Sequence, residues 1–223
     1  MAPTLSKQDF LERRRYMVDG QLRTGDVTAS NLLAAFLDTP REAFVAPAQV
    51  AFAYVDGDQP SLGSKARRLL PPLCLARLLQ AARIVPGDRA LDLAGGAGYG
   101  AALLGRLGAR VVALESDAGA AEAAKIALAG QTEIEVVVGD LAAGAPSKGP
   151  YDVIIVNGAF EVLPDTLIAQ LAEGGRLVGI ENHGRAQEAV LIERASSGVS
   201  RRVLFETRAT TIEAFRRPPS FAF

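Results

Sequence analysis

The sequence has very little of several residue types that would point to particular binding or scaffold classes. Its 223 residues include one cysteine, one histidine and no tryptophan, and the formal net charge is −1. A single cysteine, Cys74, excludes an internal disulfide, and a cytoplasmic location is therefore expected. The small net charge gives no basic footprint of the kind that binds nucleic acid or an anionic membrane.

Long hydrophobic runs and metal-binding spacings are also lacking. No stretch of about 18 uncharged apolar residues occurs, so no membrane-spanning helix is expected. The segment "MAPTLSKQDFLERRRYM" has no apolar centre of the type found in secretory signals. His183 is the only histidine and belongs to no Cys/His cluster, so no metal site is predicted. The sequence does not indicate an oligomeric state.

The composition that remains, 49% hydrophobic and 22% charged, is typical of a globular protein. Residues 1–83 are predicted to form an N-terminal helical cap with an acceptor-side loop. Residues 84–223 alternate short apolar strands with helical stretches and are predicted to form an α/β domain, which makes one compact unit with the cap.

Five runs in the second part are almost continuously apolar: "RALDLA", "ARVVALE", "IEVVVGD", "YDVIIVNG" and "GGRLVGI". Strands that are buried on both faces have this character. We therefore predict a doubly wound, mostly parallel Rossmann-like sheet, with crossover helices in "YGAALLGRLG", "AGAAEAAKIALAG" and "LPDTLIAQLAEG". The segments "AVLIERASSG" and "SRRVLFETRAT" predict a C-terminal antiparallel hairpin.

The stretch "ALDLAGGAGYG", residues 90–100, places glycines directly after the first of these strands. In such sheets the ligand binds beyond the carboxyl ends of the strands. Gly96, Gly98 and Ala101 satisfy a loose dinucleotide pattern, and Glu115 follows at the distance expected of a ribose-binding acid, so a nicotinamide cofactor is one interpretation. Asp92 argues against it, because a carboxylate here would repel a pyrophosphate.

S-adenosylmethionine has no phosphate and carries two cationic groups, which a carboxylate can hold directly or through water. The pattern Asp92-x-Ala94-x-Gly96-x-Gly98 therefore favours this methyl donor, with Glu115 accepting from the ribose hydroxyls and Asp140 from the adenine amino group. The predicted donor-binding residues are Asp92, Ala94, Gly95, Gly96, Gly98, Tyr99, Glu115, Ser116, Asp140, Leu141 and Asn157.

Several of these residues also have a purely structural interpretation. The glycines could form only a tight strand–helix turn, and Asp92 could cap that turn. Glu115 could be a solvated strand end, and Asn157 could serve as a helix N-cap rather than hold the donor or a substrate group.

Over most of its length the chain resembles the protein-L-isoaspartate O-methyltransferase family. The similar segments include "MVDGQLRTGDV", "TPREAFVAPAQVAFAYVD" and "VPGDRALDLAGGAGYGAALLGRL", followed in the family's order by "VVVGDLAAGAP", "YDVIIVNGAF" and "LIAQLAEGGRLV". The resemblance implies methyl transfer from S-adenosylmethionine to the α-carboxyl group of an isoaspartyl residue in a damaged protein or peptide. Such a step mainly requires that the two reactants be aligned and desolvated.

The resemblance fails in one acceptor segment. The family carries Gln-Thr-Ile-Ser-Gln-Pro, whose serine contacts the carboxylate, whereas residues 67–72 read "RRLLPP". Leu70 stands at the serine position and has no hydrogen-bonding side chain, so the catalytic residue is unassigned and isoaspartyl activity stays open. Arg67 or Arg68 could bind the acceptor carboxylate in place of the serine, or both could be solvated loop residues. Ser64 could supply a replacement hydroxyl.

We expect a methyltransferase of the isoaspartyl-repair type with a diverged acceptor loop. The alternatives are a methyltransferase with a different acceptor and a donor-binding protein without repair activity. A nicotinamide-dependent oxidoreductase is the third alternative, which Asp92 disfavours.

Overall fold

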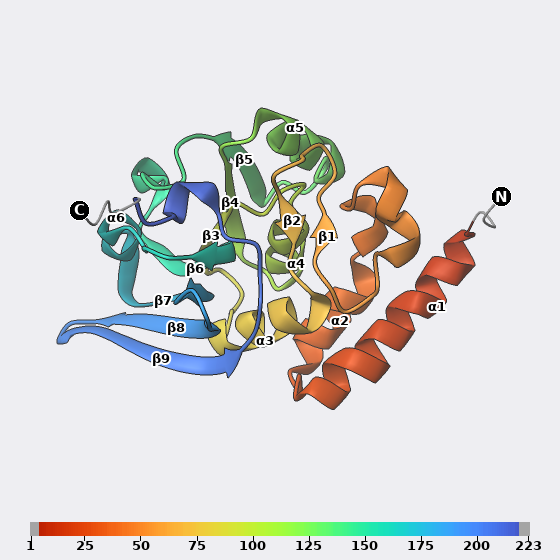
Figure 1. Ribbon diagram of the computed structural model, residues 1–223, viewed down its shortest axis with the longest axis horizontal. Coiled ribbons are helices and arrows are strands. Elements are labelled where there is room, and N and C mark those ends of the chain that lie inside the picture. The colour runs from red at the N-terminus through yellow and green to blue at the C-terminus, as the bar shows by residue number, and fades with distance from the viewer. Residues whose placement is uncertain (1–4, 219–223) are drawn as a thin grey trace.

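The computed structural model describes residues 5–218, and its centre is one seven-stranded sheet (Figure 1). The spatial order of the strands is β5-β4-β3-β6-β7-β8-β9. Their bounds are β3 Arg89–Leu93, β4 Arg110–Glu115, β5 Ile134–Val138, β6 Tyr151–Phe160, β7 Leu171–Asn182, β8 Gln187–Ala195 and β9 Gly198–Glu206. Neighbouring strands from β5 to β7 run parallel, and β8 is antiparallel to both β7 and β9. The predicted mostly parallel sheet and C-terminal hairpin are confirmed.

The central strands are apolar on both sides because both faces of the sheet are covered. Along β3, Ala90 joins one hydrophobic cluster, whereas Leu91 and Leu93 join the other. The first cluster also contains buried side chains of four helices: α2 (Ser30–Asp38), α3 (Pro72–Ala82), α4 (Tyr99–Arg106) and α5 (Ala118–Ala127). Alternation between two buried faces explains the continuous apolar runs in the sequence.

The second face is covered by shorter segments. The crossover helix predicted between β6 and β7 is only α6 (Asp165–Ala169), because both strands are longer than predicted and Tyr151 already pairs with Leu171. A 3₁₀ helix over Glu213–Phe215 covers the same face, and Ile212 and Phe215 are buried in its cluster. Within residues 5–218 no helix is both long and apolar enough to cross a membrane.

The N-terminal helix α1 (Lys7–Met17) begins with a capping box, in which the Ser6 side chain accepts from the Asp9 backbone and Asp9 accepts from the Ser6 backbone. The chain then continues through a π-helical turn to α2, which contacts both α3 and α4.

The predicted acceptor-side loop within residues 1–83 contains a small hairpin. Strands β1 (Gln59–Pro60) and β2 (Arg68–Leu69) pair antiparallel and place residues 61–67 as the connecting loop between them. Two-residue strands have no detectable sequence period, which is why the segment carried no strand signal. In Figure 1 this hairpin lies next to α4 and the carboxyl ends of β3 and β4.

Candidate functional site

The candidate site lies where the strand order reverses, between β3 and β6, at the carboxyl edge of the sheet. The turn after β3 has positive φ angles at Ala94 (58°), Gly96 (64°) and Gly98 (91°). Ala94 stands where glycine is usual, and it adopts the same left-handed backbone conformation. This conformation costs an alanine about 1–2 kcal/mol. The turn leads directly into α4, as predicted.

Asp92 is buried beneath this turn. Its Oδ1 accepts a hydrogen bond of 2.8 Å from Asn157 Nδ2, whereas Oδ2 has no hydrogen-bond partner among the described residues. A Cβ atom at Gly95 would lie 2.1 Å from Oδ2, and one at Gly100 would lie 2.5 Å from Oδ1. The glycines therefore allow the backbone to close over a buried carboxyl group that retains unused acceptor capacity. This fits a cationic ligand better than a pyrophosphate.

The pKa of Asp92 is raised to about 7: burial is the largest cause, the hydrogen bond from Asn157 opposes the shift, and the charge of Glu115 adds to it. The ordinary pKa of an unfolded aspartate is about 3.9, so the folded protein holds this proton over the pH range in which the unfolded chain has lost it. The stability contributed by the neutral carboxyl group is therefore lost as pH rises through about 7.

We expect the free energy of unfolding of the unmodified protein to fall relative to that of Asp92→Asn between about pH 4 and pH 8, mostly below pH 7. A shift of about three pKa units corresponds to at most about 4 kcal/mol. Urea unfolding of both proteins at several pH values measures the difference. Parallel pH profiles would show that Asp92 ionises normally in the folded protein.

Glu115, at the end of β4, is 2% exposed and its oxygens are fully engaged. Oε1 accepts from the Gly96 backbone at 2.6 Å and Oε2 accepts from the Ser116 backbone at 3.2 Å. Arg67 Nε lies 3.2 Å from Oε1 and 2.9 Å from Oε2. The acid predicted to hold a ribose is thus bound to the glycine turn on one side and covered by an arginine on the other.

The remaining predicted residues of this edge lie around Glu115. The Ser116 hydroxyl accepts a 2.8 Å hydrogen bond from Arg67 Nη2. Asp140 follows β5, is exposed, and accepts from the Ala142 backbone through Oδ1. Leu141 is buried in the second hydrophobic cluster. The structure therefore places these side chains at consecutive strand ends, and their contact with a donor stays a prediction.

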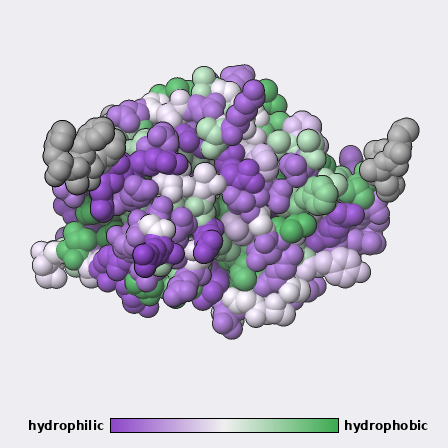
Figure 2. All heavy atoms as spheres, viewed as in Figure 1, coloured by the Kyte–Doolittle hydropathy of each residue, from purple (hydrophilic) through white to green (hydrophobic). Residues whose placement is uncertain are grey.

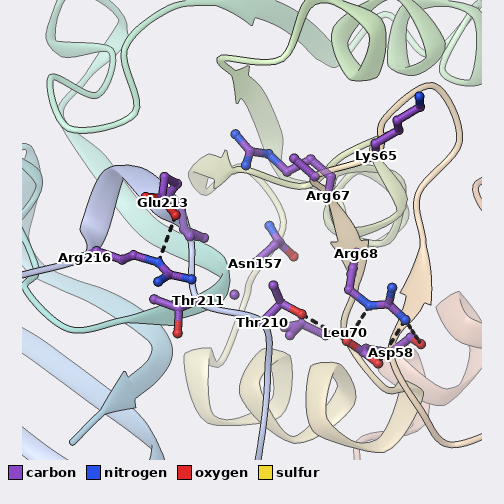
Figure 3. Close-up of a pocket in the computed structure, with 13 residues that line it drawn as sticks. Asp58, Lys65, Arg67, Arg68, Leu70, Asn157, Thr210, Thr211, Glu213 and Arg216 are labelled. Carbon is purple, nitrogen blue, oxygen red and sulfur yellow. Dashed lines mark hydrogen bonds and ion pairs between the residues drawn. The ribbon is translucent and has the colours of Figure 1, made fainter. Parts of the chain in front are cut away.

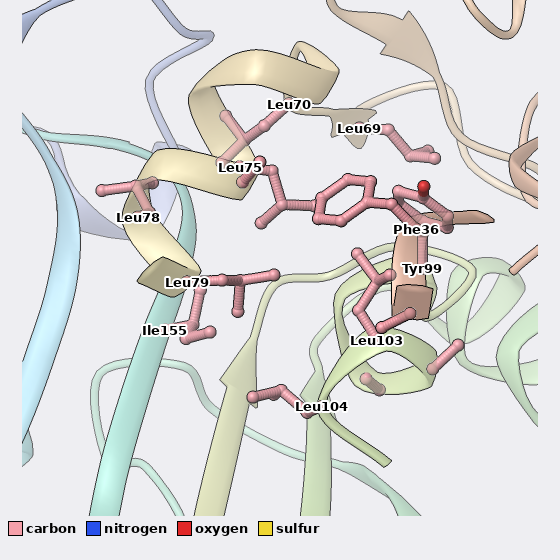
Figure 4. Packing of buried hydrophobic residues seen from close by; sticks show 14 of the residues in the cluster. Phe36, Leu69, Leu70, Leu75, Leu78, Leu79, Tyr99, Leu103, Leu104 and Ile155 are labelled. Atoms are coloured by element: carbon pink, nitrogen blue, oxygen red, sulfur yellow. The ribbon is translucent and has the colours of Figure 1, made fainter. Parts of the chain in front are cut away.

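Tyr99 is an exception, since its ring lies in the core rather than at the strand edge. It is 1% exposed and packs edge-on against Phe36, with ring centroids 6.1 Å apart, and against Phe44 (Figure 4). The guanidinium of Arg41 lies 4.9 Å from its ring centroid. The Tyr99 ring thus packs α4 against the N-terminal helices, and contact of this residue with a donor stays a prediction.

The loop between β1 and β2 covers the glycine turn. The Ser61 hydroxyl accepts a 2.8 Å hydrogen bond from the Ala97 backbone, and a Cβ atom at Gly96 would lie 2.3 Å from that hydroxyl oxygen. Ser61 could not be identified from the sequence, because a serine in a loop does not indicate a hydrogen-bond partner 36 positions away.

Ser64 holds this loop in place. Its hydroxyl donates to Asp117 Oδ2 at 2.6 Å and accepts from the backbones of Ala66 and Arg67. Asp117 is the N-cap residue of α5. The Ser64 hydroxyl is thus engaged by the protein itself, and its role as a replacement for the missing family hydroxyl stays a prediction.

A cavity of about 320 Å³ opens beside the covered edge (Figure 3). Four cationic and two anionic side chains line it: Lys65, Arg67, Arg68, Arg216, Asp58 and Glu213. In the view of Figure 2, hydrophilic side chains gather over the middle of the molecule, where the β1–β2 hairpin faces the C-terminal segment. The surplus of positive charge suits an anionic ligand.

The arginines of this cavity differ in exposure, and only Arg67 is buried. Arg67 is only 9% exposed, and Arg68 forms an ion pair with Asp58, with Nε 2.6 Å from Oδ2. Arg216 pairs with Glu213 at 2.9 Å. Among residues 5–218, Lys65 forms no ion pair.

Asn157 joins the covered edge to the cavity. It lies inside β6, so the alternative that it caps a helix is wrong. Its Nδ2 donates to Asp92 and to the Leu93 carbonyl, and the residue also lines the cavity. The Asn157 side chain therefore lies between the buried carboxyl group of Asp92 and the cation-rich cavity.

Leu70 lines the same cavity but is 3% exposed and packs in the core beside α3 (Figure 4). Its carbonyl accepts a 2.8 Å hydrogen bond from the buried Arg41. The sequence position expected to contact an acceptor therefore lies at the cavity, with an apolar side chain.

The far wall of the cavity was missed by the sequence analysis. Thr210, Thr211 and Arg216 come from the C-terminal segment, and Thr210 donates to Asp58 across 152 positions of sequence. Nothing local in a sequence signals such a contact.

His183 is exposed and lies outside this cavity, near Glu188. Residues 5–218 hold no group of three His, Cys, Asp or Glu side chains placed to bind a metal ion.

Comparison with known proteins gives one family. The sequence model described as protein-L-isoaspartate(D-aspartate) O-methyltransferase matches residues 12–212. A protein-L-isoaspartate O-methyltransferase of Koribacter versatilis is 36% identical over 211 residues, which cover 93% of this chain and 94% of that protein. Its counterpart in Methylorubrum extorquens is 39% identical over 181 residues, covering 79% and 78% of the two chains.

Solved structures agree with this match. A protein-L-isoaspartate O-methyltransferase superimposes with a TM-score of 0.78 and 29% identity, over 89% of this chain and 65% of that longer chain. A Plasmodium falciparum protein, described as a putative protein-L-isoaspartate O-methyltransferase in complex with S-adenosyl-L-homocysteine, gives a TM-score of 0.75. That likeness covers 90% of this chain and 98% of the other at 18% identity, so it concerns the fold alone.

Proposed function

The chain belongs to the protein-L-isoaspartate(D-aspartate) O-methyltransferase family, and we propose that it transfers a methyl group from S-adenosylmethionine to the free carboxylate of an isoaspartyl residue. It is an S-adenosylmethionine-dependent methyltransferase, and its acceptor is a damaged protein or peptide. The observation that carries the proposal is Asn157, which binds Asp92 and also lines the cation-rich cavity.

The donor site is assigned to the carboxyl edge of β3, β4 and β5. Asp92 supplies a carboxyl group beneath the glycine turn, where the donor's cationic methionine portion would lie and would favour its ionised form. Glu115 accepts from the ribose hydroxyls, and Asp140 lies at the next strand end, beside the adenine. Asp92 Oδ2, which has no hydrogen-bond partner within residues 5–218, and the close approach of Gly95 support this fit.

The acceptor site is assigned to the adjoining cavity. S-adenosylmethionine supplies a methyl group on a sulfonium; an acceptor carboxylate oxygen bonds to that carbon as the carbon–sulfur bond breaks, and the sulfur keeps the bonding electron pair. The protein holds the carboxylate in line and excludes water from it. Because the methyl group passes from the edge to the cavity, the two sites must adjoin, as they do at Asn157.

Arg68 takes the place of the hydroxyl that Leu70 lacks. Its Nε and Nη2 face Asp58, and among the described residues Nη1 has no hydrogen-bond partner. A guanidinium binds a carboxylate through charge-assisted hydrogen bonds that are stronger than that of a neutral hydroxyl. The loss of the family serine therefore changes how the carboxylate is held, not whether it is held.

We expect the protein to form base-labile methyl esters on an isoaspartyl peptide and not on the same peptide with a normal aspartyl residue. Labelled S-adenosylmethionine measures the transfer. Arg68→Ala should raise the KM for the peptide by about ten- to a hundredfold, since a hydrogen bond to a charged group contributes about 1.5–3 kcal/mol.

The matched control is Arg106→Ala, which removes an exposed arginine from α4 outside the cavity and should leave the peptide KM unchanged. Absence of transfer to the isoaspartyl peptide, with S-adenosylhomocysteine still bound, would contradict the proposed acceptor. An unchanged KM in Arg68→Ala would remove Arg68 from the acceptor site.

A further inference from the structure

The contacts of Glu115 leave no acceptor position for a ribose. A carboxylate has about four lone-pair sites, and the four contacts from Gly96, Ser116 and Arg67 use all of them. The Glu115 side chain is 3% exposed beneath Arg67. Ribose hydroxyls can reach these oxygens only if the Arg67 guanidinium leaves.

Only the side chain of Arg67 needs to move. Its backbone N–H donates to Ser64 Oγ at 3.0 Å, and its carbonyl accepts from the Ser61 backbone at 2.9 Å. Ser61 is itself fixed to the glycine turn through Ala97. The guanidinium can therefore rotate away from Glu115 while the loop stays closed over the edge.

The cavity is the polar space next to this side chain. Arg67 already lines it together with Lys65 and Arg68, and Figure 3 shows the Arg67 side chain crossing above Asn157. A guanidinium that leaves a buried carboxylate needs another anion, because an uncompensated buried charge is costly. The carboxylate of the acceptor is such an anion.

We infer that Arg67 couples the two substrates of this site: the donor ribose displaces its guanidinium from Glu115, and the displaced guanidinium then binds the acceptor carboxylate in the adjoining cavity. The inference rests on the proposed function, since it requires both a ribose donor and an anionic acceptor. Donor binding thus precedes and strengthens acceptor binding, and by linkage the acceptor strengthens donor binding equally.

Arg67→Ala tests the inference because it should act on the two ligands in opposite directions. The variant no longer has to vacate Glu115, so S-adenosylhomocysteine should bind about three- to thirtyfold more tightly, if the open form makes up about 3 to 30% of the unmodified protein. A labelled isoaspartyl peptide should bind more weakly. Calorimetry measures the first change and fluorescence anisotropy the second.

The coupling itself is measured by titrating the peptide with and without saturating S-adenosylhomocysteine. In the unmodified protein the nucleoside should tighten peptide binding by about five- to a hundredfold, and in Arg67→Ala this effect should largely disappear. Arg68→Ala is the matched control: it should weaken peptide binding but leave the affinity for S-adenosylhomocysteine unchanged, because Arg68 pairs with Asp58 and not with Glu115. Arg67→Gln serves as a second variant if the alanine form does not fold.

The outcomes separate the inference from the function it rests on. Equal or weaker nucleoside binding in a folded Arg67 variant, or peptide binding that does not depend on the nucleoside, overturns the coupling while methyl transfer can stand. Failure of both the unmodified protein and Arg67→Ala to bind S-adenosylhomocysteine overturns the donor site itself.

Discussion

Glu115→Ala is expected to weaken binding of S-adenosylhomocysteine by about tenfold to several hundredfold, with the fold intact. The carboxylate is proposed to accept from two ribose hydroxyls, and a hydrogen bond to a charged group contributes about 1.5–3 kcal/mol. Part of the loss is recovered, because the variant no longer has an Arg67–Glu115 pair to break. Isothermal calorimetry gives the dissociation constants, and circular dichroism confirms folding.

A double-variant cycle separates the contribution of Glu115 from that of Arg67. If both act through the same carboxylate, Arg67→Ala improves nucleoside binding in the unmodified background and has little effect in the Glu115→Ala background. Glu122→Ala on the exposed surface of α5 is the control, and it should bind normally. A dissociation constant that does not change in Glu115→Ala would place Glu115 outside the donor site.

The sheet and the covered edge could be predicted because their signals are local. Strands buried on both faces have continuous apolar runs, and the turn after β3 is a short motif in which Gly96 and Gly98 adopt the positive φ angles that glycine permits. Asp92 and Glu115 end neighbouring parallel strands, so their proximity follows from the sheet alone. Asn157 was identified as a site residue for the same reason, although its alternative role as a helix cap failed because β6 extends past it.

The acceptor side could not be predicted, because its geometry depends on contacts between distant segments. Arg67 meets Glu115 across 48 positions, and Thr210 meets Asp58 across 152. A sequence shows the arginines but not the acids opposite them, so binding residues and solvated loop residues look alike. The packing of the Tyr99 ring in the core could not be predicted for a related reason: the residue follows the glycines along the chain, yet a helix that begins there points successive side chains in different directions.

The second large effect is expected at Gly63, where the covering loop meets α5. A Cβ atom at this position would lie 2.4 Å from the Gly119 carbonyl oxygen, and a Cβ at Gly119 would lie 2.3 Å from the Gly63 carbonyl oxygen. Both neighbours are backbone atoms, which cannot rotate away. Gly63 also has a φ of 75°, a conformation that costs other residues about 1–2 kcal/mol.

Gly63→Ala is therefore expected to lower the free energy of unfolding by about 2–4 kcal/mol, as backbone strain and overpacking add. Gly57→Ala in the same segment is the matched control, since the nearest atom to its Cβ, Gln59 Nε2, is 4.0 Å away. It should change stability by less than about 0.5 kcal/mol. Urea unfolding of the three proteins measures both differences.

In Gly63→Ala the loop between β1 and β2 could relieve this strain only by detaching from α5. Detachment would break the Ser64–Asp117 and Arg67–Glu115 contacts, so the free energy of those contacts sets the upper limit of the loss. It would also loosen the backbone around the exposed bond after Lys65, and trypsin should then cut Gly63→Ala faster than Gly57→Ala under native conditions. Equal stability and equal cleavage of the two variants would mean that the loop does not pack on α5 in solution. In that case Arg67 would not be held over Glu115, and neither the covered edge nor the coupling through Arg67 would stand.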